Sequence, residues 1–392
     1  MSFVSHLECV RCAKAFESGK PLNLCDCGAP LAVKYTLKAP EFSDFRERLS
    51  SRPATLWRYR EVLPVGREES IVSLGEGWTP LVRSRNLADR LKIPNLYFKD
   101  ESFNPTGSFK ARGMSVAVSM ARELGIEKLA VPSAGNAGGA LAAYAARAGL
   151  KALVYMPEST PAANIQECRL MGAEVVLVQG SIKDCGREMR ERITGSDWFD
   201  CSTLREPYRV EGKKTLAYEV CEQLGWRVPE VMIYPTGGGT GLVGMWKAFD
   251  EMQAMGWIGH RRPKMFAVQA TGCAPILRAF ARQKDVAEEW PEPQTIASGL
   301  RVPSAIGDFW MLRVLRESRG GGIAVEDEMM LEGVRELAET EGIVTSPEGG
   351  AVIAALRRLS QDGYISGLET VVVFLTATGY KYSEVIEALD RM

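Results

Sequence analysis

Short apolar runs alternate with longer amphipathic segments from about residue 93 onward. The apolar runs have the length and the β-branched content that are typical of buried strands. They cover residues 95–101, 128–135, 151–157 and 174–180. The helices predicted between and after them cover residues 115–125, 138–149, 161–173 and 182–193. This alternation favours parallel sheets covered by helices, so the predicted fold class is α/β.

Three later strands are each predicted to end in a turn that is rich in glycine or threonine. They are the runs EVMIY, KMFAVQAT and TVVVFLT, of which the first continues into Gly237–Gly241 and the last into Thr376–Gly379. In open α/β sheets, ligands bind beyond the carboxyl ends of the strands, where such turns lie. Predicted helices at residues 351–359 and 383–392 complete the main body, and no separate regulatory domain is evident after residue 350.

The composition is that of a large globular protein, and it argues against several classes of function. Of the 392 residues 46% are hydrophobic, and the formal net charge is −1 with the basic residues scattered, so no nucleic-acid-binding face is predicted. The first residues lack the basic leader and apolar core of a secretory signal, and no apolar stretch approaches the roughly 20 residues that span a bilayer. Nine cysteines, most of them isolated from one another, suit a reducing compartment, and the predicted location is the cytoplasm.

Histidine is too scarce for several common kinds of catalysis. Only His6 and His260 occur. A Ser-His-Asp triad, a Cys-His pair or a multi-histidine metal site is therefore not expected. Acid–base chemistry must come from lysine, carboxylates, hydroxyls or a cofactor.

The first 40 residues carry two cysteine pairs, Cys9-x-x-Cys12 and Cys25-x-Cys27. Four thiolates at this separation can surround zinc tetrahedrally, as in a small zinc ribbon. The second pair is one residue shorter than the usual spacing, and a reduced, metal-free hairpin is the alternative. Zinc would have a structural role here, because four thiolate ligands leave no open position on the metal.

Lys110 follows the turn Pro105–Phe109 and is predicted to lie near the start of a helix. In an apolar setting at a helix start the pKa of a lysine falls, because burial and the helix dipole both disfavour the ammonium form. A neutral amine can attack an aldehyde and form a Schiff base. The alternative is a surface lysine in a helix start that Thr106 or Ser108 caps.

The segment Gly237–Gly241 lies between a strand and a predicted helix. Without Cβ atoms, its backbone N–H groups can surround a phosphate at the helix N-terminus, and Thr240 can add its hydroxyl. The segment also begins a formal match to GxGxxG, but the next strand ends in Gln269–Thr271 and not in the acidic residue that binds ribose in dinucleotide-binding folds. A phosphate-binding turn is predicted, and a purely structural turn is the alternative.

Asn136 lies in a third turn, SAGNAGG, at the end of the strand predicted at residues 128–135. It is expected at a helix N-terminus facing the cleft, and an ordinary asparagine cap is the alternative. A ligand that satisfies all three turns needs a phosphate for the glycines, an aldehyde for Lys110 and an oxygen for the Asn136 amide. Pyridoxal 5′-phosphate has these three groups.

Five longer segments occur in the order found in pyridoxal-phosphate enzymes of the tryptophan synthase β-subunit type: they are KDESFNPTGSFKARGM, SAGNAGG, EPYRVEGKKT, PTGGGTG and TATGYK. Within that group the chain most resembles the threonine synthases, over nearly its whole length and including the N-terminal cysteine hairpin. The resemblance implies fold type II, with two open, mostly parallel twisted sheets wound by helices after a small cysteine-rich hairpin. The domains expected are residues 1–40 for the hairpin, 41–115 with 212–392 for a large cofactor-binding domain, and 116–211 for a small domain.

The resemblance also implies roles for individual residues. Lys110 would be the catalytic residue and would carry the cofactor as a Schiff base, Asn136 would donate a hydrogen bond to the phenolic oxygen, and Thr376 would lie beside the pyridine nitrogen. A neutral hydroxyl there leaves the nitrogen largely unprotonated, which suits elimination and replacement chemistry. The residues that would hold the cofactor phosphate are Gly237, Gly238, Gly239, Thr240 and Gly241.

The reaction that the resemblance implies is the conversion of O-phosphohomoserine and water to threonine and phosphate. A departing phosphate calls for cations in the cleft. The candidates within or beside the motifs are Lys99, Arg112, Arg209 and Lys213. The expected partner is thus a small amino-acid substrate, with no nucleic acid or membrane, and the resembling family implies a homodimer.

Two alternatives to this function remain at this point. Ala111, Ala137 and Gly138 differ from the residues usual in threonine synthases and favour a threonine or serine ammonia-lyase or a β-replacing enzyme. The other alternative is a zinc-ribbon interaction protein with a catalytically inert body. An intact Lys110 and an intact glycine turn argue against an inert body.

Overall fold

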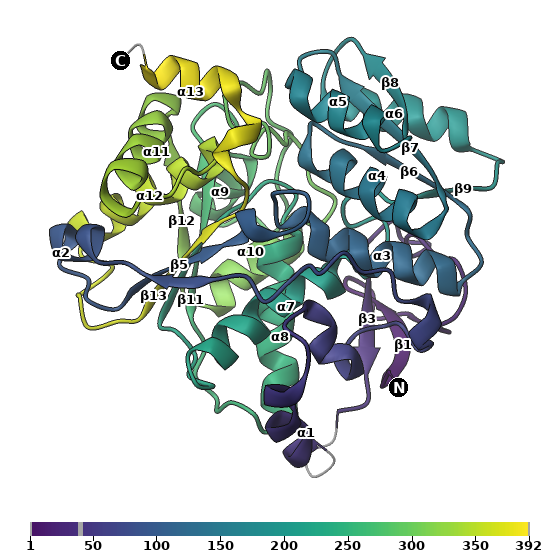
Figure 1. Ribbon diagram of the computed structural model, residues 1–392, viewed down its shortest axis with the longest axis horizontal. Coiled ribbons are helices and arrows are strands. Elements are labelled where there is room, and N and C mark those ends of the chain that lie inside the picture. Colours follow the sequence, from purple (N-terminus) through teal and green to yellow (C-terminus); the bar gives the residue numbers. More distant parts are fainter. Residues whose placement is uncertain (1, 38–41, 391–392) are drawn as a thin grey trace.

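The computed structural model describes residues 2–37 and 42–390, and in these residues helices surround three β-sheets (Figure 1). The smallest sheet lies near the N-terminus and is antiparallel, with the strand order β2-β1-β3. Its strands are β1 (Val4–Cys9), β2 (Ala15–Phe16) and β3 (Leu31–Tyr35).

The largest sheet has the strand order β12-β11-β10-β13-β5-β4. All neighbouring strands are parallel except β4, which pairs antiparallel with β5. The strands β10 and β13 are buried at every position, because helices cover both faces of the sheet. The strand bounds are β4 (Leu81–Arg83), β5 (Leu96–Asp100), β10 (Val231–Pro235), β11 (Lys264–Ala270), β12 (Gly321–Val325) and β13 (Val371–Leu375).

The third sheet is parallel throughout, with the strand order β8-β7-β6-β9. Its strands are β6 (Lys128–Pro132), β7 (Lys151–Pro157), β8 (Glu174–Val178) and β9 (Trp198–Asp200). The helices around it are α4 (Asn136–Ala148), α5 (Ala162–Leu170) and α6 (Ile182–Ile193). The α/β fold class predicted from the alternation of strands and helices is confirmed.

Three helices lie between the two larger sheets: α3 (Lys110–Glu123), α7 (Tyr208–Gln223) and α8 (Thr240–Ala254). Helix α3 begins five residues before the segment predicted from the sequence, at Lys110 and not at residue 115. A Cβ at Gly212 would lie 2.0 Å from the carbonyl oxygen of Arg112, so glycine at this position allows α7 to approach α3 closely. The remaining helices are α1 (Ser43–Arg48), α2 (Asn86–Leu91), α9 (Pro275–Ala281), α10 (Asp308–Glu317), α11 (Asp327–Glu341), α12 (Pro347–Gln361) and α13 (Ser383–Asp390).

The strands of the six-stranded sheet come from residues 81–100 and 231–375, and those of the four-stranded sheet from residues 128–200. This distribution supports a division into a large and a small domain. The predicted boundaries after residues 115 and 211 fall inside α3 and α7, so their positions stay a prediction. The boundary after residue 40 lies outside the described residues. In the part of the chain that the structure describes, no helix has both the length and the apolar character required to cross a membrane.

Candidate active site

A cavity of about 480 Å³ is lined by the turns that follow β6, β10 and β13 and by the segment 298–306. This volume lies in the range of small-molecule sites. The structure brings together on its wall every residue that the sequence predicted for the cofactor. These are Lys110, Asn136, Gly237, Gly238, Gly239, Thr240, Gly241 and Thr376.

Lys110 is the first residue of α3 and lines the cavity. Burial lowers its pKa to about 8, and the positive charge of Arg209 adds to this effect more than Glu348 opposes it. About a tenth of the amine is therefore neutral at pH 7, compared with less than about one part in a thousand for an exposed lysine. Phe109 occupies the N-cap position of α3, although the Ser108 hydroxyl accepts a long hydrogen bond of 3.4 Å from the Lys110 N–H. Burial of the amine argues against the alternative of a surface lysine.

The glycine turn connects β10 to the start of α8. Gly239 is the N-cap of α8 with a φ of 80°, and a Cβ there would lie 2.1 Å from Met311 Sδ. The N–H groups of Gly237, Gly238 and Gly239 donate no hydrogen bond to any described residue. Because the first N–H groups of a helix also lack partners, the turn offers a cluster of bare donors that suits a phosphate.

Asn136 is the first residue of α4, and Gly135 occupies the N-cap position, so Asn136 is not the helix cap of the alternative interpretation. Its Nδ2 donates a hydrogen bond of 3.0 Å to the hydroxyl oxygen of Tyr382, while its Oδ1 is buried and has no partner among the residues that the structure describes. A buried polar atom without a hydrogen bond is costly in free energy, which indicates a missing ligand. If the amide rotates by 180°, Tyr382 can donate to Oδ1, and Nδ2 is left for an acceptor such as a phenolic oxygen.

Thr376 directly follows β13 and is held next to the start of α3. Its carbonyl oxygen accepts a hydrogen bond of 2.9 Å from the N–H of Phe109, and Ser108 pairs with Ala377 in an isolated β-bridge. The Thr376 hydroxyl forms no hydrogen bond within residues 2–37 and 42–390. It is therefore available to a ligand in the cavity.

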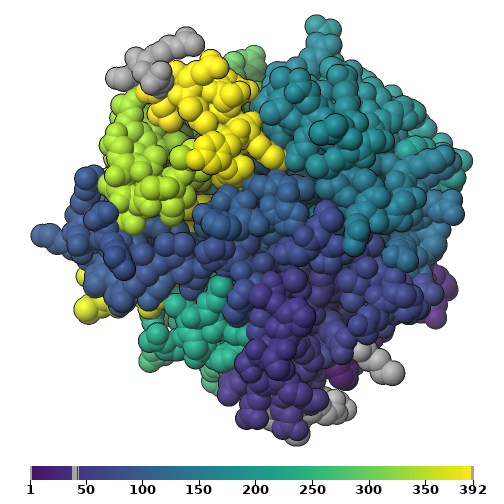
Figure 2. Space-filling model, in the orientation of Figure 1, coloured from purple at the N-terminus to yellow at the C-terminus, as the bar shows by residue number. Residues whose placement is uncertain are grey.

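The segment after Thr376 crosses from the six-stranded sheet to the four-stranded sheet. Lys381, in the short helix η6 (Gly379–Lys381), forms an ion pair of 2.7 Å with Glu167 of α5. Tyr382 then contacts Asn136. In Figure 2 the yellow C-terminal part of the surface lies beside a teal part of the surface. These contacts between the two sheets were not predicted from the sequence, because the segment TATGYK was assigned only to the cofactor ring.

Three arginines outside the motifs also line the cavity: Arg190 of α6, Arg205 and Arg301. Within the described residues, none of their guanidinium groups forms an ion pair or donates a hydrogen bond. Burial lowers the pKa of Arg190, and the charge of Arg205 adds to the effect, so these two cations lie near each other. Unpaired guanidinium groups on a cavity wall indicate an anionic ligand.

Glu348 of α12 is the single carboxylate among the cavity-lining residues. Its Oε1 accepts a hydrogen bond of 2.7 Å from the N–H of Gly299, and its Oε2 is buried with no partner in residues 2–37 and 42–390. The free oxygen can accept a hydrogen bond from a ligand. No motif in the sequence singled out this residue, because it lies in a helix remote from the three turns.

A family model described as pyridoxal-phosphate dependent enzyme matches residues 72–377. A threonine synthase of Methanocaldococcus jannaschii is 37% identical over 95% of this chain and 92% of its own length, and one of Methanosarcina acetivorans is 34% identical over 95% and 91%. The chain belongs to the threonine synthases, a family of pyridoxal-phosphate dependent enzymes. Maize serine racemase has a TM-score of 0.67 over 91% of this chain and 99% of its own at 19% identity, a likeness that concerns the fold alone.

The cavity of this threonine synthase fits its cofactor. The glycine turn provides bare N–H groups for a phosphate, Asn136 has an amide atom without a partner, and Lys110 has an amine with a lowered pKa. These features match the phosphate, the phenolic oxygen and the aldehyde of pyridoxal phosphate. The prediction of this cofactor is confirmed by the family, and the assignment of each residue to it remains a proposal.

None of the four cations predicted for the leaving phosphate lines the cavity. Lys99 and Arg112 are fully buried, form ion pairs with Glu101 and Glu219, and do not line the cavity. Arg209 and Lys213 each act on a residue that lines the cavity. Arg209 lowers the pKa of Lys110, and Lys213 donates a hydrogen bond to the carbonyl oxygen of Phe109.

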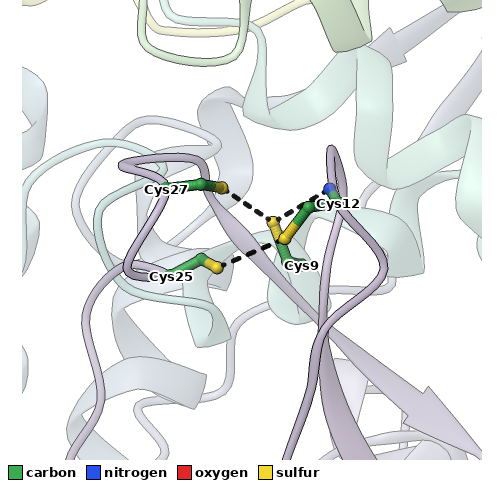
Figure 3. Close-up of side chains that lie close together, drawn as sticks. All are labelled: Cys9, Cys12, Cys25 and Cys27. Atoms are coloured by element: carbon green, nitrogen blue, oxygen red, sulfur yellow. Dashed lines mark hydrogen bonds between the residues drawn. The ribbon is translucent and has the colours of Figure 1, made fainter.

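The four cysteines predicted as zinc ligands come together near the N-terminus of the threonine synthase. Cys9 and Cys12 lie at the end of β1 and in the turn after it, and Cys25 and Cys27 lie in the turn before β3. Their sulfur atoms all lie within 4.8 Å of one another and point to a common centre (Figure 3). Zinc itself remains a prediction here.

Proposed function

We propose that this chain converts O-phosphohomoserine and water to threonine and phosphate. The observation that supports this most directly is the number of anion sites in the cavity. The glycine turn provides for the phosphate of the cofactor, while Arg190, Arg205 and Arg301 remain unpaired on the wall. A phosphorylated substrate would satisfy these three arginines, whereas threonine or serine carries no second phosphate.

In this proposal Lys110 forms the covalent link to the cofactor, Asn136 donates to the phenolic oxygen, and the hydroxyl of Thr376 meets the ring nitrogen. The segment Gly237–Gly241 holds the cofactor phosphate through its N–H groups, with the Thr240 hydroxyl beside them. When bound, pyridoxal phosphate supplies an aldehyde for the amine of the substrate and an electron sink for the charge that develops on its carbon atoms.

Lys110 acts as the base once the substrate amine has taken its place on the cofactor. Its neutral Nζ accepts the proton from Cα of the substrate and then helps to transfer the proton from Cβ to Cγ. A pKa of about 8 places the amine close to neutral pH, where it can both accept and return a proton. The same amine finally displaces the product.

The remaining cavity groups orient the substrate. The N–H groups of Asn136 and Ala137 at the start of α4 have no hydrogen-bond partner in the described part of the chain and suit the substrate carboxylate. The arginines of the wall hold the phosphate, which leaves Cγ with the bonding electron pair. Cγ then gains a proton, water adds a hydroxyl to Cβ and a proton returns to Cα, so that ester and water balance threonine and phosphate.

Parallel assays of purified holoenzyme with O-phosphohomoserine, threonine and O-phosphoserine test the proposal. Phosphate, ammonia and amino-acid products are measured for each substrate. Phosphate and threonine in equal amounts are expected from O-phosphohomoserine. We expect Arg190→Gln to raise KM for this substrate about tenfold or more, because a charged hydrogen bond is lost. Arg187→Gln is the matched control, since Arg187 lies exposed on the same helix and pairs with Asp184.

The second candidate function is a threonine or serine ammonia-lyase. The observation in its favour is that Ala137 and Gly138, which differ from the residues usual in threonine synthases, carry no hydroxyl. Ala137 lines the cavity, and a Cβ at Gly138 would lie 2.7 Å from Met156 Cε. Ammonia from threonine, with no turnover of O-phosphohomoserine, would establish this candidate and reject the synthase reaction.

The proposal includes a cytoplasmic location and a homodimer. All nine cysteines are free thiols in the structure, which suits a reducing compartment. Light scattering during size-exclusion chromatography should give a mass near twice that of the 43.1 kDa chain. A mass of one chain would reject the homodimer.

A further inference from the structure

The four N-terminal cysteines have the spacing of a tetrahedral metal site. The Sγ atoms of Cys9 and Cys27 lie 3.5 Å apart, and those of Cys12 and Cys25 lie 3.6 Å apart. Zinc with four Zn–S bonds of about 2.3 Å would place its sulfur ligands about 3.8 Å from one another. Cys9 and Cys25 are buried while Cys12 and Cys27 are exposed, so the centre lies half-buried at the surface.

Two tight backbone turns present these sulfur atoms. In the first, the N–H of Cys9 donates to the carbonyl oxygen of Lys14, and the N–H groups of Arg11 and Cys12 point at Cys9 Sγ over 3.5 and 3.4 Å. N–H donors of this kind stabilise negative charge on a metal-bound sulfur. In the second turn the N–H of Gly28 donates to the carbonyl oxygen of Cys25 over 2.8 Å. The shorter Cys-x-Cys spacing therefore does not prevent both sulfurs from reaching the centre.

We propose that Cys9, Cys12, Cys25 and Cys27 bind one zinc ion as thiolates, and that this metal fixes the wall of the active-site cavity formed by residues 200–206. Four sulfur ligands in a tetrahedron select zinc or iron over the metals that prefer oxygen, and zinc is the usual occupant of two such turns. Each thiol loses its proton when the metal binds. The site has no open position, so the metal acts through structure only.

Asn23 connects the metal site to the cavity. Its Nδ2 donates hydrogen bonds to the carbonyl oxygens of Asp200, over 2.8 Å, and Arg205, over 3.3 Å. Asn23 lies two residues before Cys25, and Leu24 between them forms a β-bridge with Pro30. A metal-bound Cys25 therefore holds the Asn23 amide in place.

The wall that Asn23 holds requires such support. Within it Leu204 has a φ of 59°, a left-handed conformation that is strained for a bulky residue. Thr203 and Arg205, on either side of Leu204, both line the cavity. The apolar side of the ribbon is also anchored, since Leu7 and Leu31 pack in one cluster with Trp57 and Tyr208. The effect on Arg205 rests on the proposed function, whereas the metal site does not.

Elemental analysis of the purified full-length enzyme tests the metal site. We expect one zinc per chain in the wild type, less than about a tenth of that in Cys12→Ser/Cys27→Ser, and full occupancy in the matched control Asp26→Asn. Asp26 lies between two ligands but is exposed, and its one ion-pair partner among the described residues is Lys14. Cobalt added to metal-free protein should give the absorption of a four-thiolate tetrahedral site.

Three results would overturn the metal site. They are protein without metal whose four thiols all react with a thiol reagent, protein that contains iron in place of zinc, and peptide maps in which these cysteines form disulfides. None of these results depends on activity, so each is distinct from a failure of the proposed reaction.

Hydrogen exchange of residues 200–206 tests the connection to the cavity. We expect faster exchange in this segment after zinc removal by a chelator and in Asn23→Ala, with no change in the exposed-site control Lys20→Ala. In both altered forms KM for O-phosphohomoserine should rise about three- to tenfold while kcat changes less, because the lost hydrogen bonds position Arg205. Unchanged exchange in Asn23→Ala, or in the metal-free enzyme, would reject the connection even where zinc is present.

Discussion

At the scale of single residues, Lys110 shows how the environment of one amine determines its reactivity. Burial and the charge of Arg209 bring its pKa to about 8, and only the neutral amine attacks an aldehyde. We expect the rate of cofactor uptake by the apoenzyme to rise with pH and to level off above about pH 8. Stopped-flow absorbance from about pH 6 to about pH 10 measures this rate. A rate that still rises steeply at pH 10, as for a lysine with the ordinary pKa of 10.5, would contradict the assignment.

Gly239 combines a left-handed backbone with a crowded Cβ position, and the other glycines of the phosphate turn have no positive φ. It has a φ of 80°, and a Cβ would lie 2.1 Å from Met311 Sδ. We expect Gly239→Ala to weaken cofactor binding about tenfold or more, because the backbone must leave the conformation that presents its N–H groups. Equilibrium titration with pyridoxal phosphate measures the affinity. Gly259→Ala is the control, since its Cβ would meet no atom within 4 Å, and equal losses in both variants would contradict a local role for the turn.

At the scale of elements, local signals in the sequence decided which segments could be predicted. Helix α6 was predicted with its observed bounds, and in the structure a Ser181–Asp184 capping box marks its start. Helix α7 was not recognised as a helix from its pattern, since its charged residues Arg209, Glu211 and Lys213 are buried and leave no solvated face. Strand β9 has only three residues, and β12 begins with two glycines, so neither carries a strong strand signal.

The same reasoning explains which parts of the site were predictable. The cofactor turns follow strands and contain residue types with special backbone or chemical properties, which a single sequence displays. The arginines of the cavity wall resemble surface charges in the sequence, and only the fold brings α6 close to the segment that contains Arg205. Lys99 and Arg112 show the reverse, because motif residues that were expected in the cleft serve the packing of α3 on α7.

Glu219 of α7 connects three elements through buried ion pairs. It binds Lys99 of β5 over 2.8 Å and Arg112 of α3 over 2.7 Å. Burial alone would raise the pKa of Glu219, but these two cations together outweigh it and bring the pKa to about 2. We expect Glu219→Gln to lower the free energy of unfolding by about 3–5 kcal/mol at pH 7, because it leaves the two cations underpaired. Urea unfolding followed by circular dichroism measures this difference.

The pH dependence of that difference provides a second check. The pKa of Glu219 is lower in the folded state than in the unfolded state. Its contribution to the free energy of unfolding is therefore complete above the ordinary pKa of 4.5 and declines as pH falls toward about 2. Wild type and Glu219→Gln should therefore converge in stability in acid. The exposed pair of Glu174 with Arg192 is the control, and Glu174→Gln should cost less than about 1 kcal/mol at any pH.

At the scale of the whole molecule, the cofactor site is a joint between two sheets. Asn136 follows β6 of the four-stranded sheet, whereas the glycine turn and Thr376 follow strands of the six-stranded sheet. Direct protein contacts across this joint include the Lys381–Glu167 ion pair and the hydrogen bond from Asn136 to Tyr382. A ligand held by all of these turns adds contacts that exist only when both sheets are in their native arrangement.

Cofactor binding should therefore stabilise the whole fold. A ligand that binds only the native state at a concentration of about a thousand times its Kd adds about 4 kcal/mol to the free energy of unfolding. We expect the thermal midpoint of the holoenzyme to exceed that of the apoenzyme by several degrees, with one cooperative transition in scanning calorimetry. Lys110→Ala with excess cofactor should keep part of this shift, because the glycine turn and Asn136 still bind. Pyridoxal without its phosphate should give a much smaller shift, since it cannot engage the N–H groups before α8. Equal shifts with pyridoxal and pyridoxal phosphate would mean that the glycine turn does not hold the phosphate.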